Sequence, residues 1–227
     1  NIRNTNDPTH PGTMIKERFD TDADPERFIT GITGKKDFSI ISMSKRGMGG
    51  AVGVLRKMLS VLERYNISVD YVPNGIDNVS LVVPTEAVAP KLYTILAEIQ
   101  SELQPDKLTV VDGIAMVAVV GRRMASQPGS SGKIFTALGQ AGVNIRMINQ
   151  GPDELNIIIG VDNRDFAEAI RRVAAFYSLP VLDLWSVSGM QPRVPVIKEK
   201  FMPDGLHPND EGQKRIAERL KYFLLSL

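Results

Sequence analysis

The chain has 227 residues, 43% of them hydrophobic, which is enough for the core of one large or two smaller domains. Lys and Arg total 27 against 26 Asp and Glu, so the formal net charge of +1 argues against a nucleic-acid or membrane-surface role that rests on bulk charge. The chain contains no cysteine, which excludes disulfides, zinc–thiolate sites and a cysteine nucleophile.

The N-terminal segment shows no targeting signal. Residues 1–4 lack the basic region and the following apolar run of a secretory signal, and no window of the sequence is apolar enough to span a membrane. The chain begins with Asn1 rather than Met, so we expect it to be a piece of a longer protein.

An internal repeat is the most informative pattern in the sequence. Met48 and Met124 lie 76 positions apart. The same offset, carried along the chain without a gap, matches apolar runs, glycines and one acid over about 45 positions. Unrelated α/β segments share apolar periodicity but not coinciding glycines, so the pattern favours a duplicated unit. The matched positions include Gly53 with Gly129, Gly75 with Gly151 and Asp77 with Asp153.

The predicted elements of each copy follow from local patterns. Apolar runs are typical of buried strands, apolar residues spaced three and four apart are typical of a helix face, and Gly-containing turns separate the second and third strands. In the first helix that face consists of Val52, Leu55, Leu59 and Leu62. The first copy is predicted to form strand 38–43, a helix starting near residue 52, strands 67–72 and 79–83, helix 86–103 and strand 107–111. The second copy is predicted to form strand 114–120, a helix around residues 134–141, strands 143–148 and 155–161, and helix 165–176.

The order strand, helix, strand, strand, helix, strand, twice over, predicts an α+β fold of two ferredoxin-like βαββαβ modules, each an antiparallel sheet with helices on one face. The fourth strand of the second module has two candidates. Residues 28–32 precede the first module. The 76-residue offset places them near 107–111, the strand predicted just before the second module. Residues 181–185 follow the last helix directly.

Several ordered motifs resemble the ACT region of aspartate kinases. They are the segments 66–70, 143–151 and 154–161, together with the opening 1–13, which in that family closes the kinase domain. The resemblance covers about residues 1–177. It implies that the two ACT modules are nested, so that residues 28–32 complete the second sheet. It also implies four parts: the end of the kinase domain and a linker (1–27), ACT module 1 with its leading strand (28–111), ACT module 2 (112–177), and a strand–loop–helix tail (178–227).

The resemblance implies a regulatory function without kinase activity in this chain. Aspartate kinases stand at the head of lysine, threonine and methionine synthesis and are feedback-inhibited by lysine or threonine at their ACT modules. A carboxylate can bind the backbone N–H groups where a glycine-rich loop enters a helix, and an acid can bind the ammonium group. The positions that match the family's effector residues are Met48, Gly49, Gly50, Ala51, Gly53, Val69 and Asp70 in the first module and, less closely, Asn144 and Gln150 in the second.

The same resemblance sets the expected cofactors and partners. No cofactor is expected here, because ATP and Mg²⁺ would bind the absent kinase domain. A homodimer through the ACT modules, a lysine or threonine effector and a cytoplasmic location are expected, with no nucleic-acid or membrane partner. Two departures bear on effector choice: Ala51 lies near a position where the family often has Ser, and Pro152 and Asp153 stand where it often has two Ser residues.

The last fifty residues follow a different pattern. The segment 204–209 and the amphipathic helix after it resemble the C-terminal end of SGNH (GDSL-type) hydrolases. That resemblance implies a dyad in which Asp204 orients His207, which would activate an upstream serine. The serine motif and the oxyanion-hole blocks have no match in the chain, so no hydrolysis is expected. An ester-hydrolase fragment and an ACT dimerisation module without ligand remain the alternative functions.

Overall fold

A computed structural model describes residues 29–121, 124, 128–151, 156–184, 188, 190, 194–203 and 208–225. The chain forms two compact units, one ending at Val173 and the other covering Ala174–Leu227. None of the described helices is long and apolar enough to cross a lipid bilayer. The predicted linker 1–27 lies outside the described residues, and the four predicted domain boundaries stay predictions.

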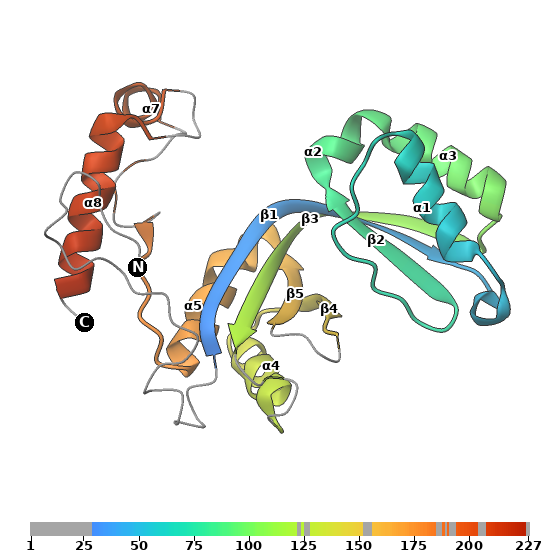
Figure 1. The fold of residues 1–227 in the computed structure, drawn as a ribbon, viewed down its shortest axis with the longest axis horizontal. Helices are drawn as coiled ribbons and strands as arrows, with labels where there is room; N and C mark the ends of the chain where they lie inside the picture. Colours follow the sequence, from blue (N-terminus) through green and yellow to red (C-terminus); the bar gives the residue numbers. More distant parts are fainter. Residues whose placement is uncertain are drawn as a thin grey trace, which may run out of the picture. The chain divides into compact units, whose positions relative to one another are not determined.

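One antiparallel sheet with the strand order β2-β1-β3-β5-β4 organises the first unit (Figure 1). Its strands are β1 (Ile29–Ser44), β2 (Asn78–Pro84), β3 (Lys107–Gly121), β4 (Ile145–Asn149) and β5 (Asn156–Asp162). β1 and β3 are much longer than the average strand, because each serves both predicted modules in turn.

The pairing of β1 with β3 resolves the choice of the missing strand. The first half of β1 pairs with the second half of β3, from Ile29 opposite Gly121 to Lys35 opposite Met116. The residues 29–32 therefore complete the sheet of the second module, as the nested arrangement implies; Phe28 lies outside the described residues. The second half of β1 pairs with the first half of β3 and belongs to the first module.

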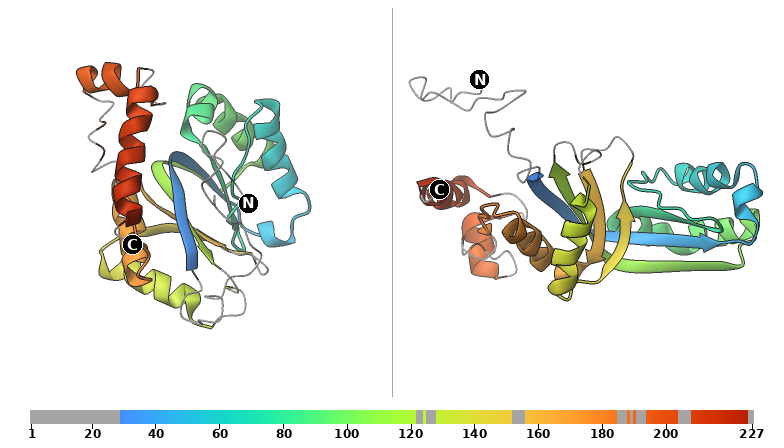
Figure 2. Two further views of the ribbon diagram at one scale, coloured as in Figure 1. Left: turned by 60° about the vertical axis from the view of Figure 1, so that its left-hand side comes forward. Right: turned by 90° about the horizontal axis from the view of Figure 1, so that it is seen from below.

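The second module has the strand order of a ferredoxin-like fold, and the first has the same order with an irregular segment in place of its edge strand. In the first module, α1 (Val54–Arg64) and α3 (Leu92–Leu103) cover one face of the sheet, and in the second, α4 (Ser130–Gln140) and α5 (Phe166–Phe176) follow the corresponding strands (Figure 2). The first core is built from alternate strand residues and one stripe of each helix. Its fully buried members include Ile41, Met43, Met58, Leu62, Leu81, Ile95 and Ile99.

The two modules repeat each other in backbone geometry, which confirms the predicted α+β duplication. Gly53 and Gly129 precede α1 and α4 with φ angles of 81° and 82°, in the left-handed region that favours glycine. The Ile67 and Val143 N–H groups donate to the carbonyls of Leu62 and Leu138 at 3.1 and 3.0 Å. The 76-residue offset thus holds for turns and hydrogen bonds as well as for sequence.

Two local predictions are wrong in detail. Residues 67–72 form no regular strand; Tyr71 and Asn74 make only isolated bridges to β2, and Pro73 between them has no N–H to donate to the sheet. The helix predicted over 86–103 is broken into α2 (Thr85–Val88), a 3-10 turn at Ala89–Lys91 and α3, because Pro90 cannot continue an α-helix.

The first helix also begins later than its apolar spacing indicates. Val52 lies before the left-handed Gly53, outside α1, and its side chain is fully exposed. Leu55 is 41% exposed, whereas Met58, Val61 and Leu62 are buried. The buried face is therefore shifted along α1, and two apolar side chains remain exposed at its start.

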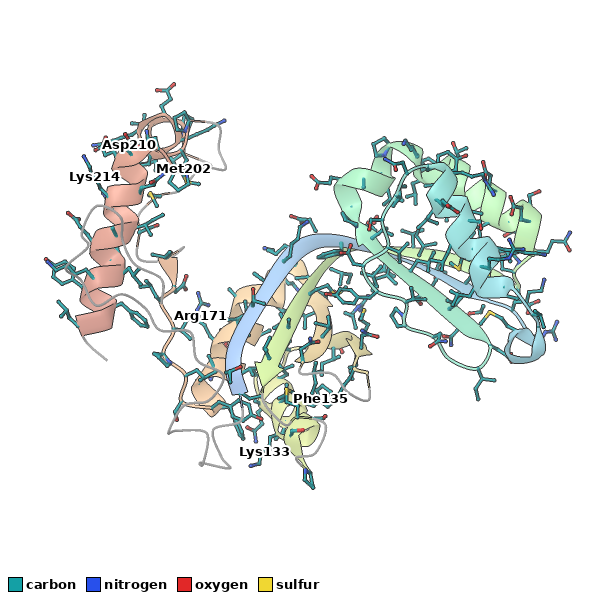
Figure 3. The ribbon with its side chains drawn as sticks, in the orientation of Figure 1. Lys133, Phe135, Arg171, Met202, Asp210 and Lys214 are labelled. Atoms are coloured by element: carbon teal, nitrogen blue, oxygen red, sulfur yellow. The ribbon has the colours of Figure 1, made fainter. Side chains whose placement is uncertain are left out.

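The second unit is helical in its described part. It contains α7 (Pro195–Phe201) and α8 (Asp210–Leu225), near whose junction Figure 3 labels Met202 and Asp210. The Asn209 side chain caps α8 by accepting a hydrogen bond from the Gly212 N–H at 3.0 Å. The strand predicted at 181–185 is wrong over its described residues, since 181–183 are irregular and Leu184 is helical. A short apolar run does not by itself distinguish strand from helix.

A cluster between α1 and α3 gives the first testable expectation. Glu98 accepts hydrogen bonds from the Tyr65 hydroxyl and from Arg64 (Nε 3.1 Å, Nη2 2.7 Å), and Tyr65 first, then Arg64, lower the pKa of Glu98. A depressed carboxyl pKa stabilises the folded state above the ordinary pKa, and this contribution is lost as the pH falls through the folded-state pKa. Between about pH 6 and pH 3, the free energy of unfolding should fall more in the wild type than in Glu98→Gln. Urea titrations of both proteins would show this; parallel pH profiles would contradict it.

Candidate functional site

The loop between β1 and α1 presents backbone N–H groups at the start of a helix. Gly47 is left-handed (φ 73°), a 3-10 turn covers Met48–Gly50, and Gly53 precedes the helix. No side chain caps α1, so the N–H groups of its first turn are not satisfied by a capping side chain. With the helix dipole, such a terminus favours a bound anion such as a carboxylate.

The loop is held by Asp77, an acid that the repeat pairs with Asp153 but that is not among the predicted effector residues. Asp77 Oδ1 accepts a hydrogen bond from the Met48 N–H at 3.1 Å, and the Asp77 carbonyl accepts one from the Lys45 N–H at 3.0 Å. A Cβ on Gly49 would lie 3.1 Å from the Ile76 carbonyl oxygen, so the loop and the turn before β2 are in close contact. The coincidence of Asp77 with Asp153 in the repeat was the signal for this role.

Asp70 and Val69 lie in the irregular segment that runs beside β2. The Asp70 N–H donates to the Val82 carbonyl at 2.9 Å, and its side chain is exposed. Val69 is partly buried against the first core. No hydrogen bond among the described residues joins Asp70 to the loop 47–53.

The second module places its two predicted residues differently. α4 follows Gly129, again without a side-chain cap, and the Ser131 hydroxyl in its first turn donates to Gln150 Oε1 at 3.3 Å. The Gln150 side chain, which follows β4 in the sequence, therefore lies beside the first turn of α4. Figure 3 labels Lys133 and Phe135 on this helix. Asn144, just before β4, lines a cavity instead.

One position has opposite charge in the two modules. The offset of 76 residues relates Asp70 to Arg146, so the second module carries a cation where the first carries the acid. Arg146 forms an ion pair with Asp162, with Nε 3.5 Å from Oδ1. An ammonium group would find no acid at this second position.

The cavity beside Asn144 has a volume of about 510 Å³ and is walled by both modules. From the first module come the turn before β2 and one face of the sheet, and from the second come residues leading into and along β4. The residues that line it are Ile40, Ser42, Pro73, Asn74, Gly75, Asn78, Ser80, Val111, Asn144, Ile145, Arg146, Met147 and Ile148.

The tail residues named from the SGNH resemblance, Asp204 and His207, lie outside the described residues. Across the described part of the chain, no group of three or more His, Asp or Glu side chains is placed to hold a metal ion.

Comparison with known proteins extends these observations. The family model described as ACT domain matches residues 117–175. Aspartokinase 3 of Bacillus subtilis is 30% identical over 171 residues, which are 75% of this chain and 37% of that protein.

Solved structures show the same fold. Clostridium acetobutylicum aspartate kinase, described as an allosteric enzyme, is 42% identical with a TM-score of 0.63, over 66% of this chain and 34% of that one. A chain from a structure of aspartokinase alpha and beta subunits is 27% identical with a TM-score of 0.58, over 66% of this chain and 99% of that one. The chain thus spans about a third of the full-length kinases it matches and nearly all of the subunit chain. These relatives do not support the SGNH interpretation of the tail.

Proposed function

Because this chain contains the C-terminal ACT regulatory region of an aspartate kinase, we propose that it binds a free amino acid, lysine or threonine, and couples that binding to the kinase activity of a longer protein. The observation that carries the proposal is the uncapped start of α1, where a glycine loop exposes backbone N–H groups on the module that also carries Asp70. The N–H groups would bind the effector carboxylate. Asp70 would bind its ammonium group, from the same subunit or from a second copy.

Asp70 is suited to this role because its carboxylate is uncommitted. Within the described part of the chain, no donor hydrogen-bonds to the Asp70 side chain and no cation pairs with it. Asp77, in contrast, is used to hold the loop. A free carboxylate next to a solvent-exposed edge is available to an ammonium ligand without the loss of an internal bond.

The charge reversal between the modules predicts that each chain binds one effector molecule. Arg146 at the position equivalent to Asp70 repels an ammonium group and is paired with Asp162. Gln150 at the start of α4 supplies only a neutral amide. We therefore propose that the first module senses the amino acid, and that the weaker candidates Asn144 and Gln150 do not form a second copy of that site.

Isothermal titration calorimetry with lysine, threonine and methionine tests the proposal. One of these amino acids should bind with a stoichiometry of one per chain, and Asp70→Asn should weaken binding by about tenfold or more, because a charge-assisted hydrogen bond is lost. Glu63→Gln, an exposed acid on α1, is the matched control and should bind normally. Binding of none of the three at millimolar concentration would leave the alternative of a dimerisation module without ligand.

The remaining features of the proposal concern the assembly. A homodimer would form through the ACT modules, and regulation would be a coupling free energy between effector binding and the arrangement of that dimer. ATP and Mg²⁺ would bind a kinase domain outside this chain, and the protein would act in the cytoplasm. An ester-hydrolase function is not proposed, since no observation favours it.

A further inference from the structure

The cavity between the modules has a different chemistry from the first module's loop. Its floor is the sheet face opposite α1 and α3, where Ser42 and Ser80 form a cross-strand pair with their hydroxyl oxygens 2.7 Å apart. Apolar side chains, including Ile40 and the buried Met147, complete the floor. A volume of about 510 Å³ is within the range of small-molecule sites.

Uncommitted polar groups converge on this cavity from both modules. The amide of Asn74 comes from the turn before β2, that of Asn78 from the first residue of β2, and that of Asn144 from the segment before β4. In the described structure none of these three amides donates or accepts a side-chain hydrogen bond. Each amide offers two donors and an acceptor to a ligand.

Arg146 sets the charge preference of the cavity. It is the sole ionisable residue among the described residues that line the cavity, and no Asp or Glu is among them. Its guanidinium approaches Asp162 through Nε at 3.5 Å, which is longer than a hydrogen bond, so donors remain for a second carboxylate. An ammonium group, however, would meet a cation and no anion on these walls.

From these observations we infer that the cavity binds a small carboxylic acid that carries hydroxyl or carbonyl groups but no ammonium group. The carboxylate would pair with Arg146, and the neutral polar groups would bind the asparagine amides and the Ser42–Ser80 pair. The inference rests on the proposed function only in treating the chain as a metabolite-sensing region, because the site, its residues and its ligand class are different.

The position of the cavity gives such a ligand a way to act on the protein. Its walls belong to two modules joined through β1 and β3, and both strands are irregular where the modules meet. Asp37 (φ 67°) and Gly113 (φ 72°) adopt left-handed conformations there, and the register shifts between Lys35 and Ile40. A ligand that contacts both walls would favour one angle between the modules over others.

Malate and aspartate form a matched pair of probes for the full 227-residue chain, since they differ by a hydroxyl in place of the ammonium group. In a ¹⁵N-labelled sample, malate should shift the backbone amide signals of Gly75 and of residues 145–148, and aspartate should shift them much less. Arg146→Gln should weaken malate binding by about tenfold or more. Arg164→Gln, whose guanidinium is exposed and lies 3.7 Å from the same Asp162 but does not line the cavity, is the control.

The outcomes separate this inference from the proposed function. Asp70→Asn should leave malate binding unchanged, and Arg146→Gln should leave the binding of the amino-acid effector unchanged. Asn74→Ala, a substitution of an exposed turn residue, should also weaken malate binding and serves if Arg146→Gln does not fold. The inference is overturned if millimolar malate leaves the cavity signals unmoved, if aspartate binds there equally well, or if binding survives both substitutions.

Discussion

Replacing Gly34 with alanine should destabilise the protein by about 3 kcal/mol, the upper part of the range for overpacking. Gly34 lies in the first half of β1, opposite Val117, where β1 completes the second module. A Cβ atom at this position would lie 2.4 Å from the Met116 carbonyl oxygen and 2.6 Å from the Phe166 ring. The backbone oxygen cannot move without distorting β3, so the strand has to shift away from its partner.

Gly31 provides the control on the same strand. A Cβ atom at Gly31 would meet no atom within 4 Å, so Gly31→Ala should change the free energy of unfolding by less than about 1 kcal/mol. Urea denaturation of the two variants measures the difference. Equal stability of the two alanine variants would mean that β1 does not pack against β3 and α5 in the way described.

Truncation of the two equivalent helix leucines should have similar, large costs. Leu62 on α1 and Leu138 on α4 are related by the repeat and are 0% and 1% exposed. Leu62→Ala and Leu138→Ala should each lower the free energy of unfolding by about 3 kcal/mol, because each leaves a cavity in a separate core. Chemical denaturation measures these costs, with unfolding monitored by a probe placed in each module.

The exposed Leu55 at the start of α1 is the matched control. It is 41% exposed, so Leu55→Ala should cost less than about 1 kcal/mol. If Leu138→Ala were as mild as Leu55→Ala, the second module would lack a core equivalent to that of the first, and the structural duplication would be wrong.

The repeat made most of the fold predictable from the sequence. A single offset paired Gly53 with Gly129 and matched the apolar positions of the two helices, because glycine and apolar spacing report directly on backbone conformation and burial. The strand at 29–32 was expected because the family resemblance implies nesting, and the pairing of Ile29 with Gly121 agrees with it.

The errors arose where one residue overrides a pattern. Pro90 interrupts a helix whose apolar spacing continues through it, and Pro73 directly follows the segment 67–72, which makes only an isolated bridge to β2. The site was less predictable than the fold. Its loop and Asp70 could be named by resemblance, but the cavity could not, because Ser42, Asn74 and Arg146 are far apart in sequence and meet only when the two modules are assembled.

The two long strands mean that neither module is a continuous piece of chain. The earliest of the described strand segments, at 29–35, waits for partners at 116–121, more than eighty residues later, before its backbone groups can pair. Closing so long a loop has an entropic cost that is recovered only when the later segment arrives, which slows folding. A polypeptide cut between the repeats would leave its second half without an edge strand, so the duplicated halves are expected to fold as one cooperative body and to resist separation into independent fragments.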